Sequence, residues 1–424
     1  MKFIFLIFFT VVTYINALDV TITDGQHVKT NILYSLSKNH PLEQEICQKI
    51  IKNFSILDRV NFYKTEFSFE NFAQYRDRKI DFLLSLEISQ DKTNQLLNIK
   101  MLSPWGASAD TAAQDWPIFY ARSYQIKKHD NLVDIANQIT DDIADRVLCI
   151  KGFASYPLAY IHKNQNNLYT IKKVDITGDL EEILYQSQNP LISLVWAPDA
   201  KKLAFVELTN DGPAIKMIDR YTKKILLNIK EDYVAAPMFS KDNRFIFYIS
   251  APTGVGQVFK RDLIAGGIEC LTLGQDWVSD INPGFDQYHL ILSTNRSGLS
   301  QLYEFNTINK KYKRLTFSDH HAFNGILSDE NQAMFYLAFN ENEHRMRLLK
   351  RSFIDKNYEE ITKEGYVESP VLAPTQSLIA YEQQFENESF IKIQSLFTQK
   401  EFILKKYTDG SRVSSPSWAS QPGK

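Results

Sequence analysis

From about residue 156 onward, the chain repeats one pattern of apolar and polar positions. A short apolar run ends in an aromatic residue, a polar turn follows, and a second apolar run comes directly after it, as in 194–206. The pattern returns at 239–248, 285–292, 327–336 and 373–381, and its first half returns at 416–420. Equivalent turn positions lie 43 to 46 residues apart. A period of about 40 to 50 residues with several strands per unit is typical of a β-propeller.

The half-pattern around Trp418 predicts how the ring closes. Strands are expected at 158–161 and 168–174, but no complete pattern precedes them. We therefore expect residues 417–419 to pair as the inner strand of the first blade, which removes an exposed sheet edge. Counted in this way, residues 156–424 form an all-β six-bladed β-propeller closed by the C-terminal strand.

Residues 32–152 lack this repeat and combine helical with alternating patterns. Apolar residues at helical spacing predict helices over 41–54 and 131–149. Asp130 is expected to cap the second helix and Gly152 to close it. A weaker helical pattern covers 68–79, and strands are expected at 80–88, 95–102 and 118–127. This segment is predicted to be an α/β domain.

The N-terminus has the features of a secretory signal peptide over residues 1–17. Met1-Lys2 precedes an apolar run from Phe3 to Ile15, and Ala17 follows. The run is shorter than the roughly 20 residues that span a bilayer, so we expect no membrane insertion after cleavage. An uncleaved anchor is the alternative. Residues 18–31 follow as an N-terminal arm, either an edge strand or a mobile segment.

Composition excludes partners that are recognised mainly by charge. Lys and Arg number 48 against 50 Asp and Glu, so neither nucleic acid nor an anionic lipid surface is expected as a ligand. Cys47, Cys149 and Cys270 are too far apart for a CxxC metal or redox motif. We expect them to be buried free thiols, with at most one disulfide.

No catalytic motif accompanies the repeat. The chain contains no Gly-x-Ser-x-Gly, His-Glu-x-x-His or Walker A sequence. Asp199, Asp242 and Asp286 recur with the repeat, which favours turn formation over acid–base catalysis. Whether a cation binds near Asp276 and Asp319 in the channel mouth stays open. We expect neither an enzyme nor a cofactor; the alternative is a secreted β-propeller enzyme of the lactonase or peptidase-associated kind.

The connections between units share a second pattern, an aromatic or basic residue followed by Val, with Pro shortly after. It occurs at Tyr233-Val234, Trp277-Val278, Tyr366-Val367 and Arg412-Val413, and the 319–323 loop breaks it. Such crossover loops surround one mouth of a propeller channel, and aromatic residues and Arg dominate the binding energy of protein interfaces. We expect a partner-binding surface there. The alternative is that these residues only pack between adjacent blades.

Over nearly its whole length, the chain resembles the TolB family, the periplasmic components of the Tol–Pal envelope system. The resemblance rests on the signal peptide, the repeat and the order of these parts. It also rests on three short segments: Ile143-Ala144-Asp145-Arg146-Val147 with Lys151-Gly152-Phe153, Leu158-Ala159-Tyr160-Ile161, and Pro416-Ser417-Trp418. Ala200 and Asn243 depart from the family, which prefers Gly at these turn positions.

The resemblance implies a monomeric periplasmic scaffold that links the inner-membrane Tol complex to the outer-membrane lipoprotein Pal, in outer-membrane integrity and cell division. It implies that a Pal-like lipoprotein binds the propeller mouth and that a TolA-like inner-membrane protein binds the arm. The mouth residues concerned are Asp232, Tyr233, Val234, Asp276, Trp277, His320, His321, Phe323, Tyr366, Val367 and Arg412. The arm residues are Leu18, Asp19, Val20, Thr21, Ile22 and Thr23.

Overall fold

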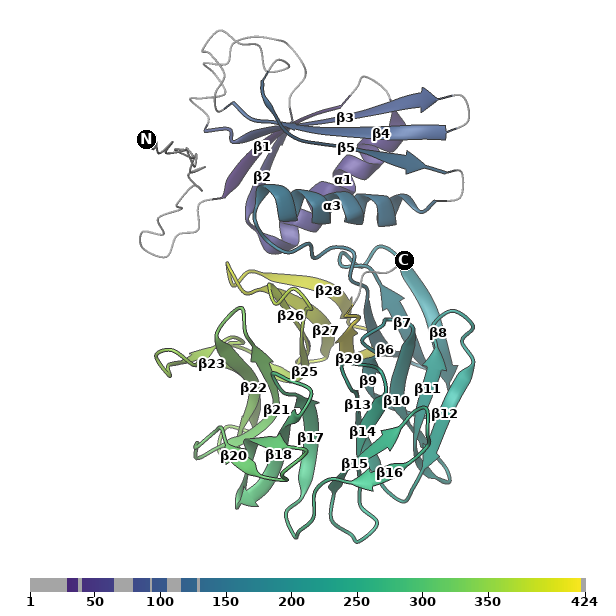
Figure 1. Cartoon of the computed structure of the whole chain (residues 1–424), viewed down its shortest axis with the longest axis vertical. Helices are drawn as coiled ribbons and strands as arrows, with labels where there is room; N and C mark the ends of the chain where they lie inside the picture. The colour runs from purple at the N-terminus through teal and green to yellow at the C-terminus, as the bar shows by residue number, and fades with distance from the viewer. Residues whose placement is uncertain are drawn as a thin grey trace, which may run out of the picture.

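The computed structural model describes residues 29–36, 40–64, 79–91, 94–104, 116–127 and 130–420. The expected signal peptide, residues 18–28 of the arm and, except for residue 79, the expected helix over 68–79 lie outside the described residues. The described chain forms a mixed α/β sheet with its helices and, below it in the view of Figure 1, a six-bladed β-propeller. The predicted fold class is confirmed.

The N-terminal sheet has five strands in the order β2 (Val60–Lys64), β1 (Thr30–Leu36), β3 (Phe82–Asp91), β4 (Asn94–Leu102) and β5 (Ile118–Ile126). β1 pairs in parallel with β2 and β3, whereas the β3–β4 and β4–β5 pairs are antiparallel. The sequence pattern predicts β3, β4 and β5 but not β1 or β2. Both are short, and a short apolar run does not by itself distinguish a strand from other structure.

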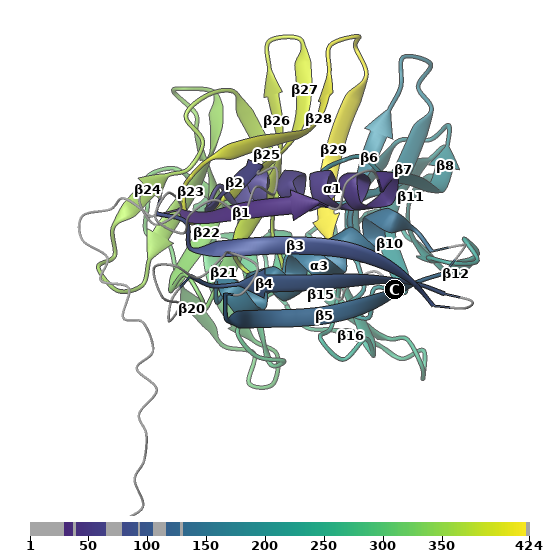
Figure 2. The same cartoon turned by 90° about the horizontal axis from the view of Figure 1, so that it is seen from above.

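Two helices of the described chain, α1 (Pro41–Leu57) and α3 (Leu132–Val147), lie between the sheet and the propeller (Figure 1). Seen from above, the sheet extends over both helices (Figure 2). The expected cap of α3 is wrong by one residue. The side chain of Asn131 accepts from the N–H of Val133 at 2.9 Å, whereas Asp130 accepts from Lys127 N–H in the preceding turn.

The expected role of Gly152 is also corrected. α3 ends at Val147, and the left-handed residue after it is Cys149, with φ 52°. Gly152 lies in the linker, where a Cβ would come within 2.5 Å of the Cβ of Asp141. The Asp141 carboxylate accepts from Ala154 N–H at 2.6 Å and from Ser155 N–H at 3.0 Å. A glycine is therefore needed for the linker to approach α3 this closely.

Each blade is a four-stranded antiparallel sheet. From the inner strand outward, the blades are β29 (Arg412–Trp418), β6 (Leu158–Lys163), β7 (Tyr169–Val174), β8 (Glu181–Ser187); β9 (Leu191–Trp196), β10 (Lys202–Thr209), β11 (Gly212–Asp219), β12 (Ile225–Lys230); β13 (Val234–Phe239), β14 (Phe245–Ser250), β15 (Gln257–Asp262), β16 (Ile268–Cys270); β17 (Val278–Pro283), β18 (His289–Ser297), β19 (Leu299–Asn306), β20 (Tyr312–Arg314); β21 (His321–Ser328), β22 (Ala333–Asn340), β23 (Arg345–Ser352), β24 (Tyr358–Glu360); β25 (Tyr366–Leu372), β26 (Leu378–Phe385), β27 (Glu388–Ser395), β28 (Glu401–Tyr407). The six inner strands contact their neighbours in a closed ring.

The C-terminal strand closes the propeller as predicted. β29 pairs antiparallel with β6, with Trp418 opposite Leu158. The Ser417 hydroxyl accepts from Trp196 N–H of the next blade at 3.1 Å. In the repeated turn, Ala200 adopts φ 56° where glycine is preferred, but its methyl is buried in the same core as Trp196 and Leu203. Burial of the methyl offsets the backbone strain.

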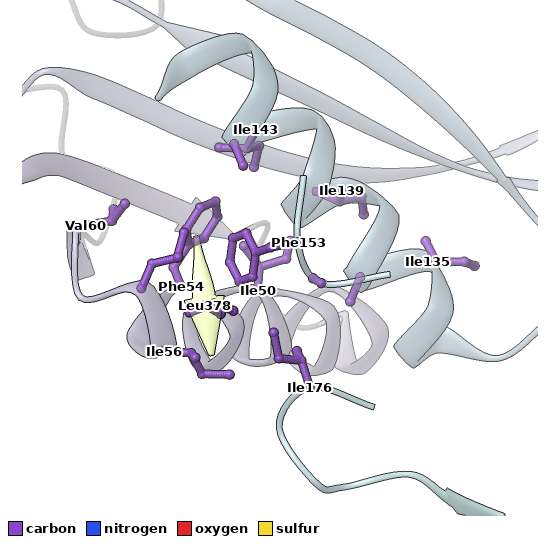
Figure 3. Close-up of a cluster of buried hydrophobic side chains, with 14 of the residues drawn as sticks. Ile50, Phe54, Ile56, Val60, Ile135, Ile139, Ile143, Phe153, Ile176 and Leu378 are labelled. Carbon is purple, nitrogen blue, oxygen red and sulfur yellow. The ribbon is translucent and has the colours of Figure 1, made fainter. Parts of the chain in front are cut away.

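The two parts of the chain share one hydrophobic core. In Figure 3, Ile50 and Phe54 of α1 and Ile139 of α3 surround Phe153 of the linker. Leu378 of the propeller belongs to the same buried cluster, as do Ile176 and Trp418. Folding of the α/β domain and of the propeller is therefore coupled through buried apolar contacts.

The cysteines are free thiols, but the expectation that all are buried is wrong. Cys47 is buried in α1, and burial raises the pKa of its thiol to about 12. Cys270 is partly exposed, and Cys149 is exposed in the left-handed turn after α3.

Within the described ranges, no helix is long and apolar enough to cross a membrane.

Candidate partner-binding site

The α/β domain covers the propeller face opposite to the crossover loops. Lys49 of α1 pairs with Asp175 in the β7–β8 turn. The hydroxyl of Ser395, the last residue of β27 before the β27–β28 turn, donates to the carbonyl of Leu57 at 3.1 Å. Because strands alternate in direction, turns between third and fourth strands all lie on one face and crossover loops lie on the other. The crossover mouth is therefore not covered by the described part of the α/β domain.

Two predicted mouth residues from neighbouring loops touch. The rings of Tyr233 and Trp277 meet edge to face, with centroids 5.4 Å apart, and both side chains are partly exposed. Trp277 is held by its backbone, since its N–H donates to the Asn295 side chain at 2.7 Å. A Cβ at Gly256 would lie 2.9 Å from the Trp277 ring, so a glycine there makes room for the indole. The sequence thus fixes the orientation of this aromatic pair.

A charged group extends the aromatic pair. The Asp276 carboxylate lies 3.1 Å from Nη1 of Arg296, and the Arg296 guanidinium lies 4.3 Å from the centroid of the Tyr312 ring. Asp232 is exposed beside Tyr233. The loops of two successive blades therefore present aromatic and charged groups side by side, as protein-binding surfaces do.

The histidine loop has a different arrangement. The His321 ring lies parallel to that of Phe323, with centroids 5.7 Å apart, and its Nε2 lies 3.2 Å from Glu341. Nδ1 of His320 lies 3.5 Å from the Asp319 carboxylate. The two histidines thus face different carboxylates. In the described ranges, no three or more His, Cys, Asp or Glu side chains are grouped so as to hold a metal ion.

The structure places the remaining mouth candidates at different depths. Arg412 is exposed and Tyr366 is partly exposed. Val234 and Val367 are buried, with exposed fractions of 3% and 0%, in the cores between adjacent blades. The valines therefore support the loops from below, and the aromatic and charged side chains form the accessible surface.

Sequence reasoning misses a pair of facing carboxylates just inside this mouth, one partly buried (Glu368) and one buried (Glu382). Glu368 of β25 lies directly opposite Glu382 of β26 in the strand register. Burial raises the pKa of Glu368, and burial together with the charge of Glu368 raises that of Glu382 to about 7. The signal that the sequence offers is the carboxylate of Glu382 within the run 378–383, which is buried throughout in the structure. Like charges directly opposite one another destabilise a sheet, so the fold tolerates a cost here.

We expect Glu382→Gln to stabilise the protein at pH 8 and to have little effect near pH 4.5. Because the folded-state pKa is raised, the unfolded chain loses its proton first, and wild-type stability falls as pH rises from about 4.5 to about 7 and then levels off. The shift from 4.5 to about 7 corresponds to about 3 kcal/mol in the free energy of unfolding. Urea unfolding at the two pH values measures it.

Glu207→Gln is the matched control with the opposite sign. Burial opposes ionisation of Glu207, but hydrogen bonds from Lys216, Ser187 and Asn189 lower its pKa to about 2. The charge is therefore stabilising in the folded state, and its removal should destabilise the protein at pH 8. Equal effects of the two variants at both pH values would contradict the assigned environment of Glu382.

Comparisons with known proteins agree with this architecture. A family model described as the TolB beta propeller domain matches residues 145–421. The chain is 33% identical over 81 residues to the Tol-Pal system protein TolB of Bordetella avium (strain 197N), covering 19% of this chain and 18% of that protein. It is 36% identical over 93 residues to the protein of the same name from Wigglesworthia glossinidia brevipalpis, covering 22% of each. The aligned segments span about a fifth of these relatives' length.

A solved structure extends the likeness to both domains. The crystal structure of TolB from Acinetobacter baumannii superposes with a TM-score of 0.78 over 93% of this chain and 97% of that chain, at 18% sequence identity. At this identity the comparison concerns the fold, whereas the family model concerns the sequence of the propeller itself. The chain belongs to the TolB family.

Proposed function

We propose that this protein is a periplasmic scaffold of a Tol–Pal system that binds a Pal-like outer-membrane lipoprotein at the crossover mouth and a TolA-like inner-membrane protein through the arm at 18–31. The observation that carries the proposal is the open crossover mouth. Its partly exposed Tyr233 and Trp277 touch one another on the face that the described α/β domain leaves uncovered. Membership of the TolB family and the names of the curated relatives support the same system.

The recurrent carboxylates favour a scaffold over a propeller enzyme. Asp199, Asp242 and Asp286 each accept a backbone N–H two residues further on, at 2.9, 3.1 and 2.8 Å. Such bonds stabilise tight turns, so these groups are engaged in structure. The proposed role is accordingly non-catalytic: the propeller holds loops in fixed positions, and the loops bind a partner.

The arm joins the body at a position suited to transmitting force. Its proposed contact residues, Leu18 to Thr23, lie outside the described residues. The described chain resumes at Lys29, whose ammonium bonds Asp58 at 2.7 Å. β1 follows at once and is hydrogen-bonded on both sides, to β2 and β3. A pull on the arm would therefore act on an interior strand of the sheet. This placement suits a protein that connects two membranes and acts during envelope constriction.

Trp277→Ala and Tyr366→Ala are each expected to weaken binding of a purified Pal homologue about 10- to 100-fold. Aromatic side chains at the centre of an interface typically contribute about 2 kcal/mol or more. Titration calorimetry with the mature chain measures the loss. Tyr288→Ala, in an exposed turn on the opposite propeller face, is the matched control and should leave Kd unchanged.

Removal of residues 18–28 tests the other half of the proposal in the same experiment. This variant should keep its affinity for the Pal homologue and lose its affinity for a TolA homologue, whereas Trp277→Ala should do the reverse. Unchanged Pal affinity in both aromatic variants would move the lipoprotein site elsewhere. Retention of the TolA homologue without the arm would refute the arm contact.

A further inference from the structure

A cavity of about 370 Å³ lies at the junction of the α/β domain, the linker and the first two blades. Its walls come from the N-terminal half of α3, from the linker between residues 154 and 157, from β7, the β7–β8 turn and the start of β8, and from the β11–β12 turn. In Figure 1, α3 lies above β7 and β8, the elements that supply these walls. Small-molecule sites typically enclose roughly 300 to 1,000 Å³, so the space suits a small ligand. It is on the propeller face away from the crossover mouth.

The acidic groups that the propeller contributes to this cavity already have cationic partners. Asp175 pairs with Lys49, and Glu181 with Lys172 at 3.2 Å. Glu182 lies 2.8 Å from the ammonium of Lys173. These ion pairs neutralise the negative charge that the propeller contributes to the wall.

Arg220 is the exception among the propeller groups. Its side chain is only 7% exposed, and the guanidinium makes one long hydrogen bond, from Nη1 to the Ala200 carbonyl at 3.4 Å. It lies 5.7 Å from the Trp196 ring and 5.2 Å from that of Tyr221. Across the described ranges, no carboxylate lies within ion-pair distance of it. A guanidinium carries five N–H donors, so most of the donors of this cavity-lining side chain have no partner among the described residues.

The repeat shows that Arg220 is not required by the blade. Its N–H donates to the carbonyl of Lys201, just after the repeated turn. Four other blades make the equivalent bond, and their residues at this position are Leu263, Thr307, Phe353 and Leu396. Three of these four are apolar. Burying an unpaired charge is costly, and only the blade beside the cavity does so at this position.

The opposite wall supplies an amide and a carboxylate. Asn137, only 4% exposed, is a residue of this wall; its Oδ1 accepts from Asn53 at 2.9 Å, and its amide N–H group has no hydrogen-bond partner among the described residues. The carboxylate of Asp134, one turn earlier on α3 and on the solvent-exposed side of the cavity, makes no hydrogen bond or ion pair with any described residue. Burial raises the pKa of its carboxyl group, whereas Lys173 and Arg220 lower it. An unpaired carboxylate and an unpaired guanidinium thus line the same cavity.

We propose that this cavity binds a small zwitterion, a free amino acid or a short peptide. The ligand carboxylate pairs with the Arg220 guanidinium and accepts from the Asn137 amide, and the ligand ammonium pairs with Asp134. Arg favours bidentate pairing with a planar carboxylate. The unpaired Asp134 favours a zwitterion over a simple anion. The ligand would contact both domains and is independent of the partner-binding mouth.

Titration calorimetry of the mature chain with glycylglycine tests the proposal. We expect one site per chain, at least 10-fold weaker binding for Arg220→Gln, and at least 5-fold weaker binding for Asp134→Asn. N-acetylglycine lacks the ammonium, so it should bind the wild type more weakly than glycylglycine does. The Asp134→Asn variant should bind the two probes equally well. Arg244→Gln is the matched control, because Arg244 lies in a turn of the next blade outside the cavity and should leave binding unchanged.

Three outcomes would overturn the proposal: no binding of glycylglycine by the wild type, unchanged binding by Arg220→Gln, or equal binding of both probes with no effect of Asp134→Asn. The last would indicate a site for plain anions. Asp134 is on an exposed turn of α3, so its variant reports on the site even where Arg220→Gln lowers the Tm.

Discussion

A chain that ends at Asp409 is expected to lose the cooperative unfolding transition of the propeller. The truncation removes β29, the inner strand of the first blade, which pairs with β6 and contacts β9 and β25. It leaves β6 as an unpaired edge and removes the buried Val413 and Trp418 from the core shared with the α/β domain. Small proteins are stable by only about 5 to 15 kcal/mol in total, so the loss of a whole buried strand exceeds what the fold can tolerate. Thermal melts followed by circular dichroism measure the effect.

Single substitutions show whether the loss of stability comes from the packing of the closing strand or from the shorter chain. Trp418→Ala should lower the free energy of unfolding by about 3 to 5 kcal/mol, as expected for a buried Trp. Trp277→Ala, at the partly exposed mouth, should have a much smaller effect. A truncated chain with the wild-type Tm would contradict the closed ring.

The repeat made the propeller predictable, including the pairing of its last strand with its first, the contact that joins the residues farthest apart in the propeller sequence. The pattern at Trp418 had no second half, and the first blade lacked a first half, so the pairing of β29 with β6 followed from counting. Element ends were less predictable. Asp130 and Asn131 are both good caps, and only the backbone geometry at Val133 decides between them. β1 and β2 are short, and their burial depends on packing against α1 and α3.

The types of residue in the crossover loops could be predicted from the sequence, but the depth at which each side chain is buried could not. Crossover loops with Tyr233 and Trp277 belong at a propeller mouth whatever the side-chain positions. The burial of Val367 depends on packing between blades, which spacing does not reveal. Arg220 shows a different limit: its neighbours in sequence give no signal, and its charge becomes unusual only when the blades are aligned by equivalent hydrogen bonds.

Lys49→Ala is expected to destabilise the protein by about 3 to 5 kcal/mol, because it leaves a buried charge without its partner. The Lys49 ammonium, 8% exposed, reaches from α1 to Asp175, to Thr177 and, at 3.0 Å, to Asp179. Burial opposes ionisation of Asp175, but the hydrogen bond from Lys49 lowers the pKa of its carboxyl, so the variant would leave this buried group without its cation. The same side chain fixes α1 to the β7–β8 turn, so the docking of the α/β domain should weaken as well. Urea unfolding at pH 7 measures the change.

Lys52→Ala is the matched control on the same helix. Lys52 bonds the other oxygen of Asp179, but its side chain is 43% exposed, so its removal should cost less than about 1 kcal/mol. Burial opposes ionisation of Asp179, but hydrogen bonds from Lys52, Thr177 and Lys49 lower its pKa from 3.8 to about 2. The network therefore stabilises the fold fully above about pH 4 and loses this contribution as pH falls towards 2. The difference between wild type and Lys49→Ala should shrink over that interval; a difference independent of pH would show that Lys49 acts through packing of its aliphatic chain instead.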